Sequence, residues 1–352
     1  MIRITTRVAT AALAIVAGMP AVAQEGPKIH LLNPFVADEF WQGCSAGAAR
    51  AAEAAGATIT ELDANNLAQT QANQIDVAIQ QAPDAILISP LDSNAVVPQL
   101  TRAMQAGSEV YAFNTAAPNA RLTATVAMDE VATGAAAAAE MARLLQERAA
   151  ATGQTEFRLL HLVGAVATEA VRLRRDGFNQ AIAQPVEGIT ITMEEVVTDW
   201  KPELAVNGLQ DALTKGPLDA IFTESDFLTP FLVPVLQREG YTPAGGGKPV
   251  LIGGLGGIPG GLTGIRDGWQ SFTLNYPIDG MCAAAVQLAA ASHDGQDFAA
   301  SWEKAAADAG LEGNAPRLVE SDTAGPSILL TANLIDASNV DSNAFWANTF
   351  RQ

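Results

Sequence analysis

The chain has 352 residues, of which 49% are hydrophobic and 16% are charged, and its 38 Asp and Glu outnumber its 20 Lys and Arg to give a formal net charge of −18. This length is more than one compact core usually holds, so we expect two domains. The apolar content excludes a disordered chain, and the acid excess repels nucleic-acid phosphates and anionic lipid surfaces. The composition therefore predicts a soluble, acidic, globular protein that binds no nucleic acid.

The N-terminal segment has the three parts of a secretory signal peptide. Arg3 and Arg7 form a basic start, residues 8–19 are almost wholly apolar, and a small-residue cleavage site ends at Ala23. No later stretch is apolar for long enough to span a bilayer. We therefore expect residues 1–23 to be removed after Ala23 and the mature protein to be free in an exported compartment, which in a bacterium is the periplasm.

Strand-like and helix-like segments alternate through the first half of the mature chain. Short β-rich runs are separated by longer runs of helical periodicity, and Gly56, Pro83 and Gly107 follow the three helical runs. This alternation predicts a βαβαβαβ unit. Its strands are expected at 28–32, 58–62, 85–89 and 109–113, and its helices at 40–55, 69–81 and 95–106.

A second series of the same kind follows the first. Strands separated by helices of this length form parallel sheets with right-handed crossovers, so the chain is predicted to fold as two doubly wound α/β lobes. Further elements after the second series indicate that the chain crosses between the lobes more than once. The expected strands are 158–163, 189–197, 219–223, 250–252, 269–274 and 328–331, and the expected helices are 169–183, 202–213, 228–239 and 281–292.

The two cysteines, Cys44 and Cys282, leave two interpretations open. An oxidising exported compartment would allow them to form a disulfide. Cysteine is also among the most buried residue types, so both can instead be separate small hydrophobic side chains in the core. Their wide separation in the sequence favours neither the disulfide nor two separate buried cysteines.

The polar and aromatic residues just beyond the predicted strands are the candidates for a binding site, because ligands of such sheets bind beyond the carboxyl ends of the strands. After the first strand, Asp38 is a suitable N-cap, and Phe40 and Trp41 begin the next helix. The aromatic pair either stacks on the apolar face of a sugar or polyol ring or packs into the core of its lobe. This segment alone favours neither interpretation.

Six segments, in the order in which they occur, resemble the successive motifs of the periplasmic sugar-binding proteins of ABC transporters, in the ribose and galactose-binding class. The resemblance runs from about residue 28 to about residue 286. The segments are FWQGCSAGAARAAEAAGA, ELDANN, DAILISPLDSNAVVP, EVYAFNT, TEAVRLRRDGF and DAIFTESD.

This resemblance implies a type I periplasmic binding protein fold, in which a multi-strand hinge joins two lobes around a ligand cleft. It assigns residues 24–127 and 276–322 to the N-terminal lobe, and residues 128–275 and 323–352 to the C-terminal lobe. It implies a monomeric receptor, not an enzyme, that closes on a small sugar-like or polyol ligand and delivers it to the membrane permease of an ABC importer, without a cofactor or metal. The alternative is a sensory receptor that presents its closed form to a chemoreceptor or a histidine kinase.

In the first lobe, the resemblance assigns ligand binding to five residues. The aromatic pair of the family falls on Phe40 and Trp41, with the preceding polar residue on Asp38. Asn114 and Thr115 stand where ribose-binding members have an Asp-Arg pair. A cleft site on this lobe is therefore expected to combine aromatic rings with one carboxylate and one amide.

In the second lobe, the resemblance assigns ligand binding to four residues. Trp200 matches a cleft aromatic, Ser225 replaces an Asn, and Asn275 lies near the position of a binding Gln. Arg172 stands where the family has a ligand-binding Arg, which suits a carboxylate or a pair of hydroxyls. We expect Arg172 to bind the ligand and Arg174 to be a surface residue.

Two charged groups of the family are missing. The strand-end Phe-Asp falls in the glycine-rich segment 253–257, and Thr115 replaces the Arg of the Asp-Arg pair. A buried hydrogen bond to a charged group contributes roughly 1.5–3 kcal/mol, and a site built for a hydroxyl rejects ligands that lack it. We therefore expect a smaller polyol, a deoxy or less polar sugar, or another small molecule with fewer hydroxyls, rather than ribose or glucose.

Motifs of other functional classes are absent or incomplete. In IGGLGGIPGG, Pro259 stands where a dinucleotide fingerprint has its third Gly. The acidic pairs 129–130 and 194–195 do not suit a hydrolase, because adjacent residues of a strand face opposite ways. The three histidines match no metal motif, and we expect His30 and His161 to be strand residues with hydrogen-bonded ring nitrogens. A DNA-binding regulator of this architecture would begin with a basic helix-turn-helix, whereas this chain is predicted to begin with a signal peptide.

Overall fold

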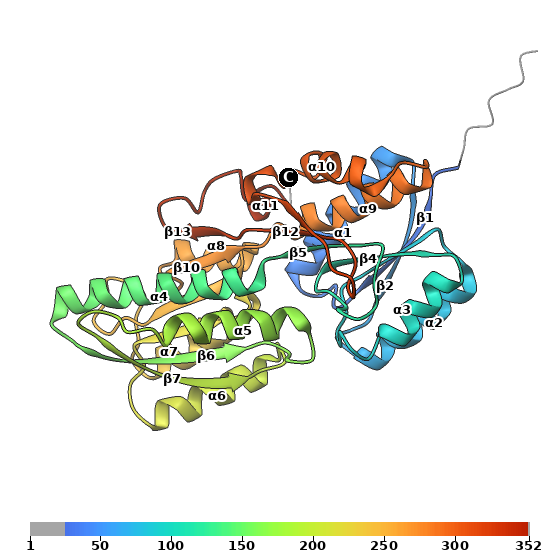
Figure 1. The fold of residues 1–352 in the computed structure, drawn as a ribbon. Coiled ribbons are helices and arrows are strands. Elements are labelled where there is room, and N and C mark those ends of the chain that lie inside the picture. The colour runs from blue at the N-terminus through green and yellow to red at the C-terminus, as the bar shows by residue number, and fades with distance from the viewer. Residues whose placement is uncertain (1–24, 351–352) are drawn as a thin grey trace, which may run out of the picture.

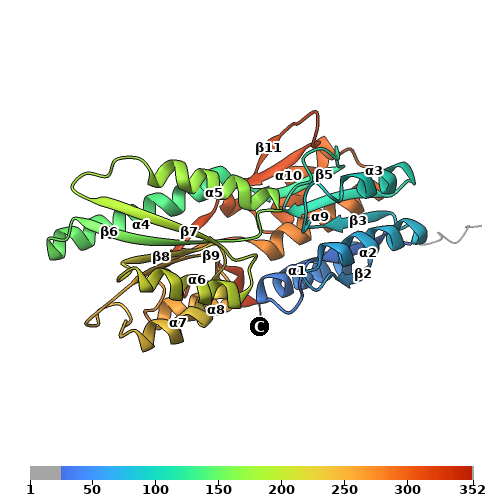
Figure 2. The ribbon, with the colours of Figure 1, turned by 90° about the horizontal axis from the view of Figure 1, so that it is seen from below.

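The computed structural model describes residues 25–350, so the predicted signal peptide lies outside the described residues. The described chain forms two α/β lobes, each built on one central sheet with helices on both faces (Figure 1). Seen from below, the two lobes lie end to end in an elongated molecule (Figure 2). The predicted two doubly wound lobes are confirmed. No helix within residues 25–350 is long and apolar enough to cross a membrane.

The first lobe contains a seven-stranded sheet in the order β11-β12-β5-β4-β3-β1-β2. All of its neighbouring strands are parallel except β11 and β12. The carboxyl ends of its parallel strands therefore meet at one edge of the sheet. The strands are β1 (Lys28–Asn33), β2 (Thr58–Asp63), β3 (Ala85–Ile88), β4 (Glu109–Asn114), β5 (Ala124–Met128), β11 (Arg317–Val319) and β12 (Ser327–Leu330).

Helices cover both faces of this sheet because its strands are apolar on both sides. Leu87 and Phe113 pack in the same core cluster as residues of α1 and α9, whereas Ile86 and Ala112 pack in the cluster that contains residues of α2 and α3. Adjacent strand residues thus serve opposite faces. The helices are α1 (Glu39–Ala55), α9 (Ile278–His293), α2 (Ala68–Gln81) and α3 (Val97–Gln105), and α10 (Phe298–Asp308) packs on α9.

Helix α1 begins and ends as the sequence predicts. The Asp38 carboxylate accepts a hydrogen bond from the Phe40 backbone N–H at 2.9 Å, and Gly56 ends the helix with a left-handed φ of 64°. Cys44 of α1 and Cys282 of α9 form a buried disulfide, which decides between the two interpretations left open by the sequence. The bond joins two helices of the same lobe.

The second lobe contains a six-stranded sheet in the order β13-β10-β9-β8-β6-β7, parallel except between β10 and β13. Helices α4 and α5 cover one face, and α6 and α7 cover the other (Figure 1). The strands are β6 (Glu156–Val163), β7 (Thr190–Val197), β8 (Ala220–Thr223), β9 (Leu251–Gly256), β10 (Phe272–Asn275) and β13 (Asn333–Asp336). The helices are α4 (Glu130–Thr152), α5 (Glu169–Ile182), α6 (Pro202–Thr214), α7 (Thr229–Arg238), α8 (Pro259–Arg266) and α11 (Trp346–Thr349).

The chain crosses between the lobes three times, from β5 to α4, from β10 to α9 and from β12 to β13. This agrees with the expectation of more than one crossing. One boundary was wrong: residues 323–352 were assigned to the C-terminal lobe, but β12 pairs with β5 in the first sheet. The third crossing therefore comes after Leu330. The remaining lobe boundaries stay a prediction.

Several elements were not predicted from the sequence. Helix α4 is rich in Ala on all sides and so lacks a distinct apolar stripe, although Asp129 caps its first turn. Strands β11 and β13 have only three and four residues and are partly exposed. The pair Asp129 and Glu130 lies at the start of α4, so the expectation that it belongs to a strand was wrong.

Candidate ligand-binding site

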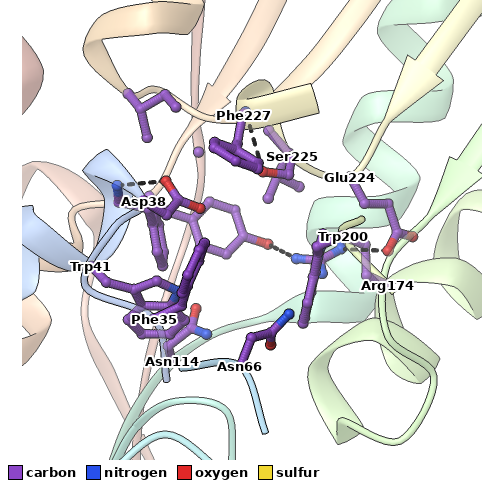
Figure 3. Close-up of a pocket in the computed structure, with 15 residues that line it drawn as sticks. Phe35, Asp38, Trp41, Asn66, Asn114, Arg174, Trp200, Glu224, Ser225 and Phe227 are labelled. Carbon is purple, nitrogen blue, oxygen red and sulfur yellow. Dashed lines mark hydrogen bonds and ion pairs between the residues drawn. The ribbon is translucent and has the colours of Figure 1, made fainter. Parts of the chain in front are cut away.

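A pocket lies between the lobes at the carboxyl ends of strands from both sheets (Figure 3). Its volume is about 70 Å³, counted as the space open to the centres of water molecules. It is lined by Phe35, Asp38, Phe40, Trp41, Asn66, Asn114, Arg174, Trp200, Glu224, Ser225, Phe227, Leu255, Gly256, Ile258 and Tyr276.

The first lobe contributes three aromatic side chains to the pocket, those of Phe35, Phe40 and Trp41. The rings of Phe40 and Trp41 meet edge to face with centroids 5.0 Å apart, and Trp41 also contacts Phe113, at 6.3 Å. Both residues line the pocket and pack against the core beneath it. Packing into the core is therefore confirmed, and because both rings also line the pocket, their stacking on a ligand stays a prediction.

Asp38 is the carboxylate of this aromatic wall. One of its oxygens caps α1, and the other accepts no hydrogen bond from residues 25–350. The pKa of Asp38 is raised to about 7, mainly by burial and to a smaller extent by the nearby carboxylates of Glu39 and Asp226, against the lowering effect of the Phe40 N–H. Asp38 is therefore poised to exchange a proton near neutral pH and, when protonated, to donate a hydrogen bond into the pocket.

The second lobe contributes a buried arginine, Arg174, on the side of the pocket opposite Asp38 (Figure 3). Its Nη1 donates to the Tyr276 hydroxyl at 2.8 Å and to Glu130 at 3.2 Å, and its Nε lies 3.6 Å from Glu224. Nη2 donates no hydrogen bond to residues 25–350. These carboxylates raise the pKa of Arg174 despite its burial, so the guanidinium stays charged.

We expected Arg172 to face the ligand and Arg174 to lie at the surface, and the structure shows the reverse placement. Arg172 does not line the pocket, and its Nη1 donates to the carbonyls of Val166 and Ala167 at 2.8 and 2.9 Å, in the loop before α5. Arg174 is only 3% exposed and lines the pocket. Two residues two positions apart on a helix point about 200° apart, so only one of them can face inward.

A chain of alternating charges extends from Arg174 to the surface of the second lobe. Glu224 lies 3.3 Å from the buried His161, which lies 3.5 Å from Glu195, and Glu195 pairs with Arg175 at 2.6 Å. Burial alone would raise the pKa of Glu224, but Arg174 and His161 lower it below its ordinary value. Burial likewise opposes the charge of His161, yet the two flanking carboxylates raise its pKa. The opposite charges on both sides thus favour the ionised forms of Glu224 and His161.

The other predicted strand histidine, His30, is a residue of β1, as expected, but its buried Nδ1 has no hydrogen-bond partner within residues 25–350. Nδ1 of His161 also lacks one, at 3.5 Å from Glu195, so the expectation of hydrogen-bonded ring nitrogens is met only at Nε2 of His161. Burial lowers the pKa of His30. It therefore favours the neutral imidazole and contributes no charge to the sheet.

Three side chains around the pocket come from residues with left-handed backbone. Asn66, Asn114 and Trp200 have φ values of 55°, 61° and 56°; Asn114 is the last residue of β4, and the other two come three residues after the ends of β2 and β7. Asparagine adopts this conformation readily, whereas for a bulky residue it costs about 1–3 kcal/mol. Trp200 also packs on Gly164, where a Cβ would lie 2.6 Å from the indole ring. The surrounding structure thus holds this tryptophan in a strained position at the pocket.

The glycine-rich end of β9 accommodates a carboxylate from the neighbouring strand end. Asp226 accepts hydrogen bonds from Gly257 N–H at 2.8 Å, Gln270 at 2.6 Å and Thr273 at 2.8 Å. A Cβ on Gly254 would lie 2.0 Å from this carboxylate, so the close approach requires glycine. The Asp226 carboxylate is engaged in hydrogen bonds within the pocket wall and does not line the pocket. The carboxylates that line the pocket are those of Asp38 and Glu224.

The structure brings together six of the nine residues that the sequence assigned to the site. Three of the nine lie elsewhere: Thr115 is buried behind the end of β4, Arg172 binds a loop, and Asn275 is buried at the end of β10. Ligand contact by the other six stays a prediction. The six that line the pocket are Asp38, Phe40, Trp41, Asn114, Trp200 and Ser225.

Nine residues that line the pocket were not among the nine assigned ones. Four of them, Phe35, Glu224, Leu255 and Tyr276, follow a predicted strand by one to three residues, so the rule that ligands bind beyond strand ends would have found these four. Glu224, for example, directly follows β8, and Tyr276 directly follows β10. The missed residues are Phe35, Asn66, Arg174, Glu224, Phe227, Leu255, Gly256, Ile258 and Tyr276.

Comparisons with known proteins agree with this architecture. A family model described as periplasmic binding protein domain matches residues 29–297. The ribose import binding protein of Salmonella typhimurium is 26% identical over 291 residues, which are 82% of this chain and 92% of the relative. The xylitol-binding protein of Mycolicibacterium smegmatis is 28% identical over 207 residues, 58% of this chain and 55% of the relative.

Solved structures show the same fold. An ABC transporter solute-binding protein from Burkholderia graminis, in complex with D-arabinose, matches with a TM-score of 0.71 and 22% identity, over 90% of this chain and 97% of that one. One from Bacillus halodurans, with bound myo-inositol, matches with a TM-score of 0.71 and 19% identity, over 91% and 98% of the two chains.

Proposed function

The chain belongs to the periplasmic binding protein domain family, and from this premise we propose that the mature protein is the solute-binding component of an ABC importer for a small sugar or polyol. It is a binding protein and not an enzyme. The relatives named for ribose and xylitol, and the structures with D-arabinose and myo-inositol, support this class of ligand.

The observation that carries the proposal is a pocket lined by both lobes, each of which contributes aromatic rings and hydrogen-bonding groups. Trp41 and Trp200 come from different lobes and suit the apolar faces of a polyol chain or sugar ring. Asn114, Arg174 and Ser225 suit its hydroxyls. Because a ligand contacts both walls only when the lobes are closed, binding stabilises the closed form.

Calorimetric titration of the purified protein with a panel of pentoses, hexoses, tetritols and pentitols tests this proposal. We expect at least one of these to bind, and we expect Trp41→Ala and Trp200→Ala each to weaken that binding at least tenfold. Trp302→Ala is the matched control, since Trp302 lies on α10 and does not line the pocket. Unchanged affinity in both pocket variants would show that the tryptophans only pack in the core.

Export and delivery complete the proposal. Removal of residues 1–23 would release a monomer into the periplasm, where its closed form would dock on a membrane permease. N-terminal sequencing of the exported protein should begin at Gln24, and deletion of the gene should abolish uptake of the ligand. Unchanged uptake with a lost behavioural response would instead assign the protein to the sensory role.

A further inference from the structure

A tyrosine hydroxyl of the protein itself lies against the pocket arginine. The side chain of Tyr276 is 1% exposed in the wall of the pocket. Its hydroxyl donates to Glu130 Oε2 at 2.7 Å and accepts a hydrogen bond from Arg174 Nη1 at 2.8 Å. Both sites of the hydroxyl are therefore engaged, and the bond from the charged guanidinium belongs to the stronger class of hydrogen bond.

The position of Tyr276 is fixed from several directions. Its backbone N–H donates to the Gly256 carbonyl at 3.2 Å, and its carbonyl accepts from the Trp346 indole N–H at 2.8 Å. Its ring lies against Phe40, with centroids 6.3 Å apart, and the Arg174 guanidinium lies 5.8 Å from the ring centroid. The phenol therefore cannot turn away to admit a ligand without breaking contacts to both lobes.

This arrangement limits what Arg174 can offer a ligand. An unengaged guanidinium binds two neighbouring oxygen atoms through two parallel N–H groups. Here Nη1 is used by Tyr276 and Glu130, and Nε is directed toward Glu224, so Nη2 remains for the ligand. The Tyr276 oxygen thus stands beside Arg174 where a ligand hydroxyl would otherwise bind.

We infer that Tyr276 is a specificity-determining residue that takes the place of one ligand hydroxyl beside Arg174, so that the site selects a short polyol over a fully hydroxylated ring sugar. This inference rests on the proposed function and adds to it the kind of ligand and the residue that selects it.

The test compares the affinities for erythritol, xylitol, D-ribose and D-glucose by calorimetric titration. We expect the wild-type protein to bind erythritol or xylitol more tightly than either sugar. Tyr276→Phe removes the oxygen and leaves Nη1 open to the pocket, so the affinity for D-ribose relative to erythritol should rise at least tenfold. Tyr276→Leu removes the ring as well and should shift the ratio in the same direction.

Tyr111→Phe is the matched control. Tyr111 is equally buried and its hydroxyl bonds to the Glu109 carboxylate at 2.7 Å, but it does not line the pocket. It should keep the wild-type ratio, and thermal unfolding will show that each variant is folded. An unchanged ratio in both Tyr276 variants, or a wild-type preference for D-ribose or D-glucose over both polyols, would overturn this inference alone. A wild-type protein that binds no sugar or polyol of the larger panel would overturn the proposed function with it.

Discussion

The two walls of the pocket are held by different forces. On the first lobe, Phe40 and Trp41 are fixed by packing against the core, and the Cys44–Cys282 disulfide lies one turn further along α1. On the second lobe, Arg174 is fixed by ion pairs and hydrogen bonds that continue through buried side chains toward the surface. One wall is apolar and covalently braced, and the other is an electrostatic network.

This difference predicts how the stability of each wall responds to the loss of one interaction. Loss of a packing contact has a graded cost, because neighbouring side chains relax into the space. Loss of one member of a buried charge network leaves its partners desolvated and unpaired, which costs more than the pair contributed. The charged wall should therefore be the more sensitive to single substitutions, and the packed wall the more sensitive to reduction.

The largest effect is expected from Glu224→Ala in the charged wall. This variant leaves the Gly164 N–H, His161 and the Nε of Arg174 without their carboxylate, at a cost of about 3–5 kcal/mol in the free energy of unfolding. Urea unfolding measures it. Glu194→Ala is the control, since Glu194 pairs with Arg158 and Lys215 near the surface and should cost about 0–1 kcal/mol. Equal losses in the two variants would contradict the contrast between the walls.

The second effect tests the brace of the packed wall. Reduction of the Cys44–Cys282 disulfide, which spans 238 residues of sequence, should lower the free energy of unfolding by about 2–4 kcal/mol. Urea unfolding with and without dithiothreitol measures this difference. The double variant Cys44→Ala, Cys282→Ala should match the reduced protein and be indifferent to the reductant. Identical unfolding midpoints for the oxidised and reduced wild type would rule out a stabilising role.

The smallest effect concerns Asp38, the carboxylate on the packed wall. Its pKa is about 7 in the folded protein and about 3.8 ordinarily, so folding disfavours its ionised form. This difference of about three pKa units corresponds to about 4 kcal/mol for a fully desolvated group. Asp38 is partly exposed and solvent screening reduces the effect, so stability should fall by about 2 kcal/mol as the pH rises from 4 to 7, and the loss should be complete above 7. Burial raises the pKa of Glu130 to about 7 as well, which adds a fall of the same sign.

Asp38→Asn separates the two contributions. Asparagine keeps the N-cap of α1 but cannot ionise, so this variant should lose the part of the fall that belongs to Asp38 and retain the part that belongs to Glu130. Urea unfolding at a series of pH values measures both curves. If the wild type and the variant lose stability in parallel between pH 4 and 7, Asp38 does not carry the predicted charge penalty.

The sequence predicted the fold well where the signals are local. The alternation of β-rich and helical runs is a property of neighbouring residues, and so are the Asp38 cap and the Gly56 stop of α1. Helix α4 was not predicted because alanine occurs on all of its sides, so no apolar stripe distinguishes one face from the others. The crossing after Leu330 was misplaced because three- and four-residue strands carry too little pattern to assign them to a sheet.

The sequence by itself determined two α/β lobes and the strand ends at which a site forms, because side-chain periodicity and helix caps depend on residues a few positions apart. Only the tertiary structure decided that Arg174 rather than Arg172 faces the pocket, since this depends on how α5 is rotated against the sheet. The pairing of Cys44 with Cys282 and the contact of Tyr276 with Arg174 join residues 238 and 102 positions apart. Contacts at such separations are set by the packing of whole elements.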